Sequence, residues 1–492
     1  MNTQDVSKPV QRKVLFAASE CAPFIKTGGL ADVVGALPAT LAGMGLDVRV
    51  VLPKYRAIPF AYTAKLRHEC DFLVKLGWRN QYCGVESLRM AGVTYYFIDN
   101  EYYFGREYIY GNFCSDEAER FAFFCKAVLE MMPRLNFFPD IAHLNDWQCG
   151  MVAALHKLQY VKLQQYRNMK TVFTVHNLRY QGVFSRDFVD ELLELGEATM
   201  APECLEYFGS VNYMKAGLVY ADAITTVSRT YAREIQTDAY GETLDGVLRA
   251  RSGVLHGIMN GIDAEAYDPS TDAYLPAHYT CADMAGKAAC KAALQDEMGL
   301  VEDADIPLIS MVTRLTGQKG LDLVECAIND IMNMDVQMCV VGTGELRYEQ
   351  LFSWASWRYP GRIAPRLVYD DRLAHRAYAG ADMFLMPSLF EPCGLAQLIA
   401  MRYGTLPIVR ETGGLADSVQ PYNKYTDEGI GFTFANYNAC DMINTIMIAA
   451  QLYSDKPSWQ RMRARAMAKR FGWQDSAKEY IALYDGLCSR IG

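Results

Sequence analysis

The sequence predicts an α/β protein made of two doubly wound domains. Short, continuous apolar segments alternate with helical patterns along almost the whole chain, which is typical of parallel strands covered by helices on both faces. A single open sheet containing all of these strands would be large, even for a chain of 492 residues that is 51% apolar. A glycine-containing stretch with an Asn260-Gly261 turn signal separates two such series. We therefore expect two domains joined near this stretch.

The expected boundaries follow from this order. Residues 1–254 form the first domain, 255–263 form a linker and 264–472 form the second domain. In the first domain, the first strand runs into a Gly-containing turn and then a helix that ends at about Leu41. The expected strands are Val14–Ala18, Val48–Leu52, Ile141–Leu144, Thr171–Val175, Ala223–Val227, Leu308–Val312, Met338–Val341, Met383–Met386 and Leu406–Val409.

Composition excludes several classes of protein. Lys and Arg number 48 against 57 Asp and Glu, and a net charge of −9 argues against wholesale binding to nucleic acid or to an anionic membrane. The 14 cysteines form no C-x-x-C pair, so reduced thiols in a cytoplasmic enzyme fit better than a disulfide framework or a zinc site. The first 13 residues are polar, and no apolar run reaches the ~20 residues of a membrane span, so we expect neither a secretory signal nor a membrane helix.

An identical hexapeptide occurs once in each domain. Thr27-Gly28-Gly29-Leu30-Ala31-Asp32 follows the first strand, and Thr412-Gly413-Gly414-Leu415-Ala416-Asp417 follows the strand that ends at Val409. A Gly-Gly turn at a helix N-terminus offers N–H groups and the helix dipole to an anion, and it lets a ligand approach the backbone. One such loop is most simply a tight turn. Two identical loops at like positions favour a ligand held between the domains.

Charged residues gather after the strands of the second domain. Arg314 and Lys319 follow the strand Leu308–Val312, at the end where doubly wound sheets bind ligands. Two cations there would neutralise a diphosphate leaving group, although surface salt bridges are an equal alternative from spacing alone.

A carboxylate follows the strand Met383–Met386. Glu391 precedes Pro392, which would fix the turn, and Gly394, which would begin a helix. A carboxylate beside free helix N–H groups is suited to binding sugar hydroxyls. Cys393 lacks a Cys-His pairing motif, so a small residue at a helix start is a simpler interpretation than a catalytic thiol.

Polar residues also end two strands of the first domain. Asp146 follows the strand Ile141–Leu144 and is a candidate acid, base or sugar ligand. His176, followed by Asn177, ends the strand Thr171–Val175 and is a candidate donor to a sugar hydroxyl, although a lone histidine is more often structural. No His or Cys cluster has the spacing of a metal site.

The segment Lys26 to Val33 resembles the signature loop of bacterial glycogen synthases and plant starch synthases. Arg314 to Lys319, Phe390 to Leu395 and the second hexapeptide match the same family in the same order. Four separated motifs in order are far more specific than one Gly-rich loop, and the resemblance extends from Lys13 to the last helix.

The resemblance implies a GT-B architecture, in which two Rossmann-like domains face each other across the active site and a helix over 473–492 crosses back to the first domain. It implies retaining transfer of glucose from ADP-glucose to the non-reducing end of an α-1,4-glucan, such as glycogen, starch or a maltooligosaccharide. No metal or other cofactor is expected. Neither nucleic acid nor a membrane is an expected partner, and a homo-oligomer is left open.

The resemblance also assigns roles to residues of the second domain. Arg314 and Lys319 would stabilise the departing ADP. Glu391, with the N–H groups of Cys393 and Gly394, would hold glucose hydroxyls.

In the first domain, the resemblance places Asp146, His176 and Asn177 toward the sugar and the acceptor. The remaining implied contacts are Lys26, Gly28 and Gly29 at the diphosphate, Asp32 near the donor sugar, Asn260 at the cleft, Tyr369 on the adenine, and Thr412, Gly413 and Gly414 at phosphate.

Residues 101–110 are dense in aromatic rings and are candidates either for contact with the glucan or for the core, which is the commoner place for such runs. Glu107, within this run, lies outside the residues that the structure describes.

Departures from the family pattern are small. Asn145-Asp146-Trp147-Gln148 stands where the family often has His-Asp-Trp-His, which argues against a role for a histidine there, while Asp146 remains. Ile399 stands eight residues after Glu391, where many related sugar transferases carry a second Glu and several of them use UDP-sugars. Three alternatives stay open: a GT-B enzyme that uses UDP-glucose, a phosphorylase with a pyridoxal-phosphate lysine and usually a longer chain, and a catalytically silent glucan-binding scaffold.

Overall fold

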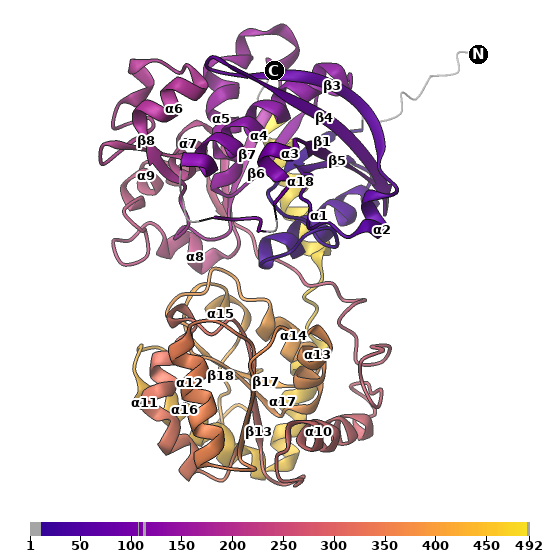
Figure 1. The fold of residues 1–492 in the computed structure, drawn as a ribbon. Coiled ribbons are helices and arrows are strands. Elements are labelled where there is room, and N and C mark those ends of the chain that lie inside the picture. The colour runs from indigo at the N-terminus through magenta and orange to yellow at the C-terminus, as the bar shows by residue number, and fades with distance from the viewer. Residues whose placement is uncertain (1–10, 107, 112–114, 490–492) are drawn as a thin grey trace, which may run out of the picture. The chain divides into compact units, whose positions relative to one another are not determined.

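The computed structural model describes residues 11–106, 108–111 and 115–489, and the chain divides into two compact units (Figure 1). Unit 1 comprises Met1–Val227, Ala232–Ile258 and Trp473–Gly492, and unit 2 comprises Ser228–Tyr231 and Met259–Gly472. The chain thus passes from unit 1 to unit 2 next to the Asn-Gly turn and returns at the last helix. No helix in the part of the chain that the structure describes has the length and apolar character needed to cross a bilayer.

Unit 1 contains a nine-stranded sheet in the order β12-β11-β7-β6-β1-β2-β5-β4-β3. The seven strands from β12 to β5 are parallel, and β4 and β3 extend one edge antiparallel. The bounds are β1 Lys13–Ala17, β2 Asp47–Pro53, β3 Arg67–Leu76, β4 Arg79–Met90, β5 Val93–Asp99, β6 Ile141–Asn145, β7 Lys170–Val175, β11 Ala223–Thr226 and β12 Leu255–Gly257. A small antiparallel sheet contains β8 Val183–Ser185, β9 Glu206–Tyr207 and β10 Ser210–Asn212.

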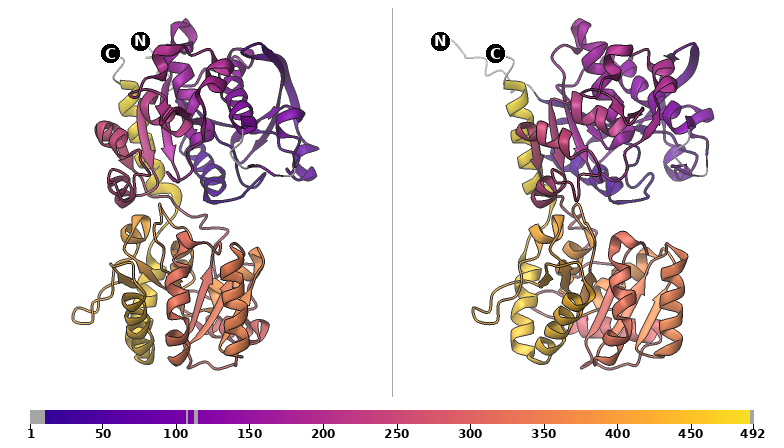
Figure 2. Two further views of the ribbon diagram at one scale, coloured as in Figure 1. Left: turned by 60° about the vertical axis from the view of Figure 1, so that its left-hand side comes forward. Right: turned by 90° about the vertical axis from the view of Figure 1, so that its left-hand side faces the viewer.

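The last helix packs against the first helix of unit 1, and Figure 2 shows it lying along that unit. The Tyr484 hydroxyl on this helix lies 2.6 Å from His143 Nδ1 on β6, in the buried core. The helices that begin in residues 11–258 or follow residue 472 are α1 Gly29–Gly43, α2 Phe60–Thr63, α3 Glu101–Phe104, α4 Ser115–Arg134, α5 Trp147–Leu158, α6 Arg186–Leu193, α7 Tyr213–Tyr220, α8 Arg229–Glu234, α9 Asp245–Ala250 and α18 Trp473–Ser489, with 3-10 turns η1 Tyr160–Lys162, η2 Gln164–Tyr166, η3 Glu197–Met200 and η4 Ser252–Val254.

Unit 2 contains a six-stranded parallel sheet in the order β15-β14-β13-β16-β17-β18. Helices α11, α12 and α16 cover one face, and α10, α13, α14 and α17 cover the other (Figure 1). The bounds are β13 Leu308–Val312, β14 Gln337–Val341, β15 Ile363–Arg366, β16 Met383–Met386, β17 Leu406–Arg410, β18 Phe432–Phe434, α10 Ala285–Met298, α11 Leu321–Asn333, α12 Leu346–Arg358, α13 Asp371–Gly380, α14 Ala396–Arg402, α15 Gly413–Ser418, α16 Ala439–Ser454, α17 Lys456–Ala468 and η5 Gly317–Lys319.

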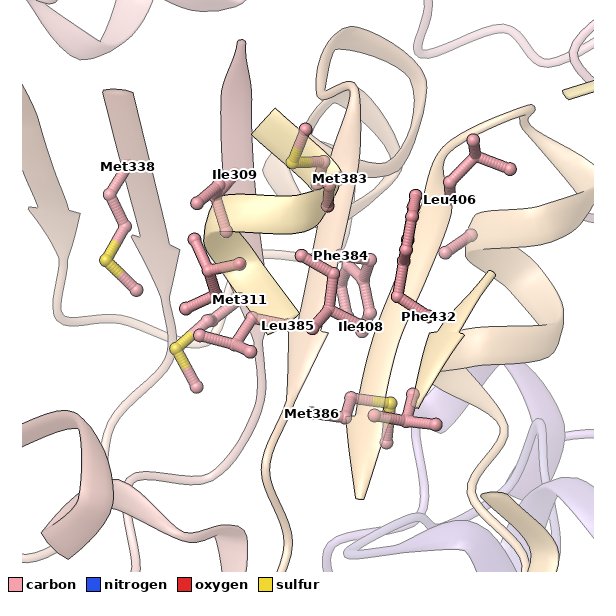
Figure 3. Packing of buried hydrophobic residues seen from close by; sticks show 14 of the residues in the cluster. Ile309, Met311, Met338, Met383, Phe384, Leu385, Met386, Leu406, Ile408 and Phe432 are labelled. Atoms are coloured by element: carbon pink, nitrogen blue, oxygen red, sulfur yellow. The ribbon is translucent and has the colours of Figure 1, made fainter. Parts of the chain in front are cut away.

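The core of unit 2 explains why its strands are apolar without alternation. Figure 3 shows side chains of β13, β14, β16, β17 and β18 packed in one cluster. All four residues of β16 are buried, because helices cover both faces of the sheet. The predicted α/β fold and all nine predicted strands are confirmed, and the helix expected to end at about Leu41 ends at Gly43.

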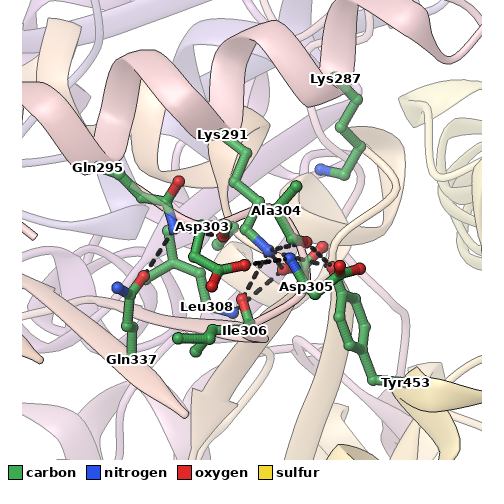
Figure 4. A network of polar contacts seen from close by, with 12 residues as sticks. Lys287, Lys291, Gln295, Asp303, Ala304, Asp305, Ile306, Leu308, Gln337 and Tyr453 are labelled. Carbon is green, nitrogen blue, oxygen red and sulfur yellow. Dashed lines mark hydrogen bonds and ion pairs between the residues drawn. The ribbon is translucent and has the colours of Figure 1, made fainter. Parts of the chain in front are cut away.

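Two buried lysines of α10 hold this helix against the sheet (Figure 4). Lys287 Nζ donates to the carbonyls of Ala379 and Tyr403 at 2.8 and 3.0 Å, and burial holds its pKa well below the usual value. Lys291 Nζ lies 2.8 Å from the Asp382 carboxylate and donates to two further carbonyls. The two side chains therefore anchor α10 to the segments that precede β16 and β17.

The two large sheets share one topology. In unit 1, β1 lies inside the sheet, the parallel strands β2 and β5 lie on one side of it, and the chain then crosses to β6 on the other side. In unit 2, β13 lies inside the sheet, β14 and β15 lie on one side of it, and the chain then crosses to β16 on the other side. The switch point lies between β1 and β6 in unit 1, and between β13 and β16 in unit 2. Loops that follow the two strands at such a point diverge, and doubly wound sheets bind ligands in the crevice at their carboxyl ends.

Candidate active site

An ion pair spans the switch point of unit 2. Lys319 ends the turn after β13, Glu391 lies in the loop after β16, and Lys319 Nζ is 2.6 Å from Glu391 Oε2. Ser388 Oγ donates to the same carboxylate oxygen at 3.0 Å. The two charged side chains are only 16% and 8% exposed, so their interaction is weakly screened by solvent. Two residues predicted to act on the substrate therefore lie together.

Arg410, which the sequence analysis missed, supports the loop that carries Glu391. This buried residue ends β17, and its guanidinium donates to the carbonyls of Ser388 and Leu389 at 3.0 and 2.8 Å. The Leu389 N–H donates to the Gln318 carbonyl at 2.9 Å and links this loop to the one that carries Lys319. The feature of the sequence that could have pointed to Arg410 is its position as the one charged residue at the end of an otherwise apolar strand.

The Arg314 side chain, unlike that of Lys319, has no polar partner among the residues that the structure describes. It is exposed and forms no ion pair or side-chain hydrogen bond with any residue that the structure describes. Tyr369, in the loop after β15, is 78% exposed. Both groups are thus accessible to a ligand at the carboxyl end of the sheet.

The second hexapeptide packs closely against the loop that carries Glu391. Gly413 has a φ of +45°, and a Cβ atom there would lie 1.9 Å from the Glu391 carbonyl oxygen. A Cβ atom at Gly414 would lie 2.0 Å from the Cys393 carbonyl oxygen, and the Gly414 N–H donates to Glu391 O at 3.1 Å. The buried Thr412 precedes the short helix α15 and accepts the Leu415 N–H through its carbonyl. These glycines let the loop lie directly against the backbone that carries Glu391.

The helix expected to begin at Gly394 begins instead at Ala396, because Gly394 takes a left-handed conformation with a φ of +70°. The neighbouring Cys393 thiol is buried, and burial raises its pKa to about 12, so the thiol is neutral and is not an activated nucleophile. Its sulfur accepts a hydrogen bond from the Asn260 backbone. The structure therefore brings Asn260 beside the Glu391 loop, and the buried Oδ1 of Asn260 has no partner among the described residues.

In unit 1, a carboxylate of the protein itself occupies part of the predicted anion site. Glu20 Oε2 accepts the backbone N–H groups of Thr27 and Gly28 at 2.5 and 3.3 Å, and its other oxygen accepts the Thr27 hydroxyl at 2.7 Å. A Cβ atom at Gly28 would meet no atom within 4 Å, so the other side of the loop is open. Gly29 begins α1, and the side chain of Lys26 lies 2.7 Å from Asp32.

Asp146 lies across the switch point from this loop. Its φ of 56° and ψ of −178° are unusual for a residue with a side chain, and such strain is concentrated at functional sites. Its carboxylate accepts the N–H of His176 at 2.7 Å and also that of Asn177. Burial raises the pKa of Asp146 to about 7, with a smaller contribution from the negative charge of Glu20. The unit 1 candidates are therefore close neighbours.

The His176 ring is oriented by the side chain of Asn145, at the end of β6. Its Nε2 lies 2.9 Å from Asn145 Oδ1, and the Asn145 amide nitrogen donates to the Ala17 carbonyl at 3.0 Å. Since the amide oxygen accepts, His176 carries its hydrogen on Nε2 and leaves Nδ1 as an acceptor. Burial lowers the pKa of His176 to about 3, so the ring is neutral. In this tautomer Nδ1 is the ring nitrogen that would accept a hydrogen, and the predicted contact of His176 with a sugar hydroxyl stays a prediction.

In the segments that the structure describes, His, Cys, Asp and Glu side chains form no group of three or more suited to a metal ion.

Comparisons with known proteins define the class of this protein. Residues 13–250 match the family described as starch synthase catalytic domain, and residues 306–450 match glycosyl transferases group 1. The structure of the catalytic domain of starch synthase IV from Arabidopsis thaliana, bound to ADP and acarbose, is similar with a TM-score of 0.90 and 32% identity over 97% of this chain and 99% of that one. Sucrose-phosphate synthase from Thermosynechococcus elongatus shares the fold, with a TM-score of 0.63 and 17% identity over 98% of this chain and 100% of its own. The chain is a glycosyltransferase with the GT-B fold.

Curated relatives narrow this class. The glycogen synthase of Anoxybacillus flavithermus is 51% identical over 98% of this chain and 99% of its own, and that of Geobacillus stearothermophilus is 52% identical over 97% and 98%. The chain belongs to the glycogen synthase family. This membership confirms the predicted activity, glucosyl transfer from ADP-glucose to a glucan.

Proposed function

We propose that this enzyme adds glucose to the non-reducing end of an α-1,4-glucan and retains the anomeric configuration of the ADP-glucose donor. The observation that carries this proposal is the Lys319–Glu391 pair at the switch point of unit 2, beside the exposed Arg314. A pairing of cations with a carboxylate suits a donor that carries both a diphosphate and a sugar. The ADP in the similar starch synthase IV structure supports the same assignment.

The cations would act on the leaving group. Arg314 and Lys319 stabilise the negative charge that develops on the diphosphate as the bond from C1 of glucose to oxygen breaks. Tyr369 packs on the adenine, and Thr412 with the adjoining Gly-Gly backbone lines the phosphate region. Asn260 supplies a neighbouring amide oxygen.

Glu391 would position the sugar. Its free Oε1 accepts a glucose hydroxyl, while Oε2 stays engaged by Lys319 and Ser388. The N–H groups of Cys393 and Gly394 complete the binding of the sugar hydroxyls. Because Glu391 is paired and the Cys393 thiol is neutral, neither is poised to attack C1.

This arrangement supports front-face transfer. The acceptor hydroxyl approaches C1 from the side of the leaving group, its oxygen bonds to C1, and its proton passes to the departing diphosphate oxygen. ADP leaves with that proton, and the new linkage is α. Asp146, His176 and Asn177 orient sugar and acceptor hydroxyls, and Lys26, Gly28, Gly29 and Asp32 contact the donor.

The enzyme would act in the cytoplasm. The described cysteines carry free thiols, a state that reducing compartments maintain.

Donor choice and stereochemistry test this proposal together. ADP-glucose and UDP-glucose are supplied in turn with maltotetraose, and the new linkage is read by proton NMR. We expect efficient transfer from ADP-glucose only and an α-1,4 linkage at the non-reducing end. Preference for UDP-glucose, or a β linkage, contradicts the proposal.

A further inference from the structure

A short segment of unit 1 is fixed at both ends by a buried ion pair on α4. Arg120 and Glu117 lie 2.8 Å apart, and each side chain is only 1% exposed. Arg120 donates to the Ile109 carbonyl at 2.5 Å, and Glu117 accepts the Gly111 N–H at 2.7 Å. The backbone on either side of Tyr110 is therefore held by the helix.

Tyr110 connects this segment to the Lys26–Gly29 loop through Glu20. The Tyr110 hydroxyl donates to Glu20 Oε1 at 2.7 Å and lies 2.8 Å from Ser19 Oγ. Burial raises the pKa of Tyr110 well above its ordinary value, so the phenol keeps its hydrogen. Because a phenol has one hydrogen and it goes to the carboxylate, the Ser19 hydroxyl is the donor in the second contact.

Hydrogen bonds from Tyr110 and from the Lys26–Gly29 loop fix the orientation of the Glu20 carboxylate. Glu20 is 3% exposed and accepts four hydrogen bonds, from the Tyr110 hydroxyl, the Thr27 hydroxyl and the N–H groups of Thr27 and Gly28. Hydrogen bonds to a buried carboxylate are stronger than neutral ones and are sensitive to geometry. One side of the loop is thus held by Glu20, and the side of Gly28 stays open.

We propose that Tyr110 is a positioning residue for the reaction: through Glu20 it holds the Lys26–Gly29 loop in the conformation that binds the donor. The proposal rests on the donor-binding role that we propose for this loop. The function proposed for Tyr110 differs from both roles considered for the aromatic run 101–110, which were contact with the glucan and packing in the core.

Tyr110→Phe tests the proposal, because it removes one oxygen and keeps the ring. Tyr103→Phe is the matched control: Tyr103 belongs to the same run, is buried, and donates to Glu119. Glu119 pairs with Arg79 and, among the described residues, forms no hydrogen bond or ion pair with the Lys26–Gly29 loop. We expect kcat/KM for ADP-glucose to fall about tenfold in Tyr110→Phe relative to Tyr103→Phe, with equal Tm values and an unchanged KM for glucan. Equal kcat/KM in the two variants overturns the proposal.

A second series separates positioning from general destabilisation. Glu20→Gln should lower kcat/KM for ADP-glucose at least as much as Tyr110→Phe, and the double variant should be no worse than Glu20→Gln alone, because both changes break one chain of contacts. Additive losses contradict the proposal. Lys26→Ala distinguishes a failure of the donor role of the loop from a failure of the positioning role of Tyr110. Normal donor kinetics in Lys26→Ala refute the donor role of the loop. Impaired donor kinetics in Lys26→Ala together with normal donor kinetics in Tyr110→Phe refute only the positioning role.

Discussion

Lys319 and Glu391 form a 2.6 Å ion pair although 72 residues separate them in the sequence. They meet because β13 and β16 are hydrogen-bonded neighbours and the loops after both strands lie at the same end of the sheet. Gly320, directly after Lys319, has a φ of +73°, and a Cβ atom there would lie 2.0 Å from the Pro387 carbonyl oxygen. The close approach of these two loops thus depends on a glycine.

Removing Lys319 should damage both activity and stability. Lys319→Ala leaves the Glu391 carboxylate in a protected environment without its cation, and losing one partner of a buried pair costs about 3 kcal/mol. We expect kcat to fall about a hundredfold or more and the free energy of unfolding to fall as well. Steady-state kinetics and urea denaturation measure the two effects, and near-normal turnover would show that Lys319 does not stabilise the leaving group.

Arg314→Ala should lower activity without lowering stability. Because Arg314 is exposed and forms no ion pair or side-chain hydrogen bond with the described residues, its loss should leave Tm within about 1 °C of the wild type. We expect kcat/KM for ADP-glucose to fall about a hundredfold. Full activity in this variant, or a large drop in Tm, contradicts the assigned role.

The repeated hexapeptide shows what the sequence could and could not predict. Both copies follow a strand and contain the start of a helix, as predicted from the apolar segments and the glycines. Their contacts differ, however: Asp32 pairs with Lys26 at 2.7 Å, whereas Asp417 accepts the N–H of Thr230 at 2.7 Å. Identical residues acquire different partners because tertiary neighbours, which no local pattern encodes, decide the contacts.

The two glycine loops should respond in opposite ways to a methyl group. Gly413→Ala forces a Cβ atom against the Glu391 carbonyl at a positive φ, and we expect it to destabilise the protein by about 3 kcal/mol. Gly28→Ala meets no atom within 4 Å, so it should fold with an unchanged Tm and raise the KM for ADP-glucose. Thermal denaturation of both variants checks this contrast, and equal Tm values would show that the second loop is not closely packed.

Asp146 should make stability depend on pH. Burial raises its pKa from 3.8 to about 7, so the folded state binds the proton more tightly than the unfolded chain does. Between about pH 4 and pH 7 the folded state therefore holds more protons, and this residue lowers stability as the pH rises. Relative to the wild type, Asp146→Asn should gain stability from pH 4.5 to pH 7.5, as measured by chemical denaturation at both values. A difference independent of pH would contradict the raised pKa.

The fold was more predictable than the site. The continuous apolar strands could be predicted from the sequence because a strand that is buried on both faces, such as β16, consists mainly of apolar residues. The antiparallel extension β3–β4 was missed because exposed residues interrupt the apolar residues of its strands. The strand Leu255–Gly257 was also missed, because it lies in the segment that we predicted to be a linker. Glu20 and Arg410 were missed because each binds the backbone of a loop, seven residues away for Glu20 and 22 residues away for Arg410, and no side-chain pattern in the sequence marks such a contact.

The most direct test of the central claim is the incorporation of radiolabelled glucose from ADP-glucose into maltooligosaccharide, by the wild type and by Glu391→Gln. We predict labelled chain ends and an equal amount of released ADP with the wild type, and a rate lower by about a hundredfold with the variant. No label with the wild type, or equal labelling by both proteins, would contradict the account.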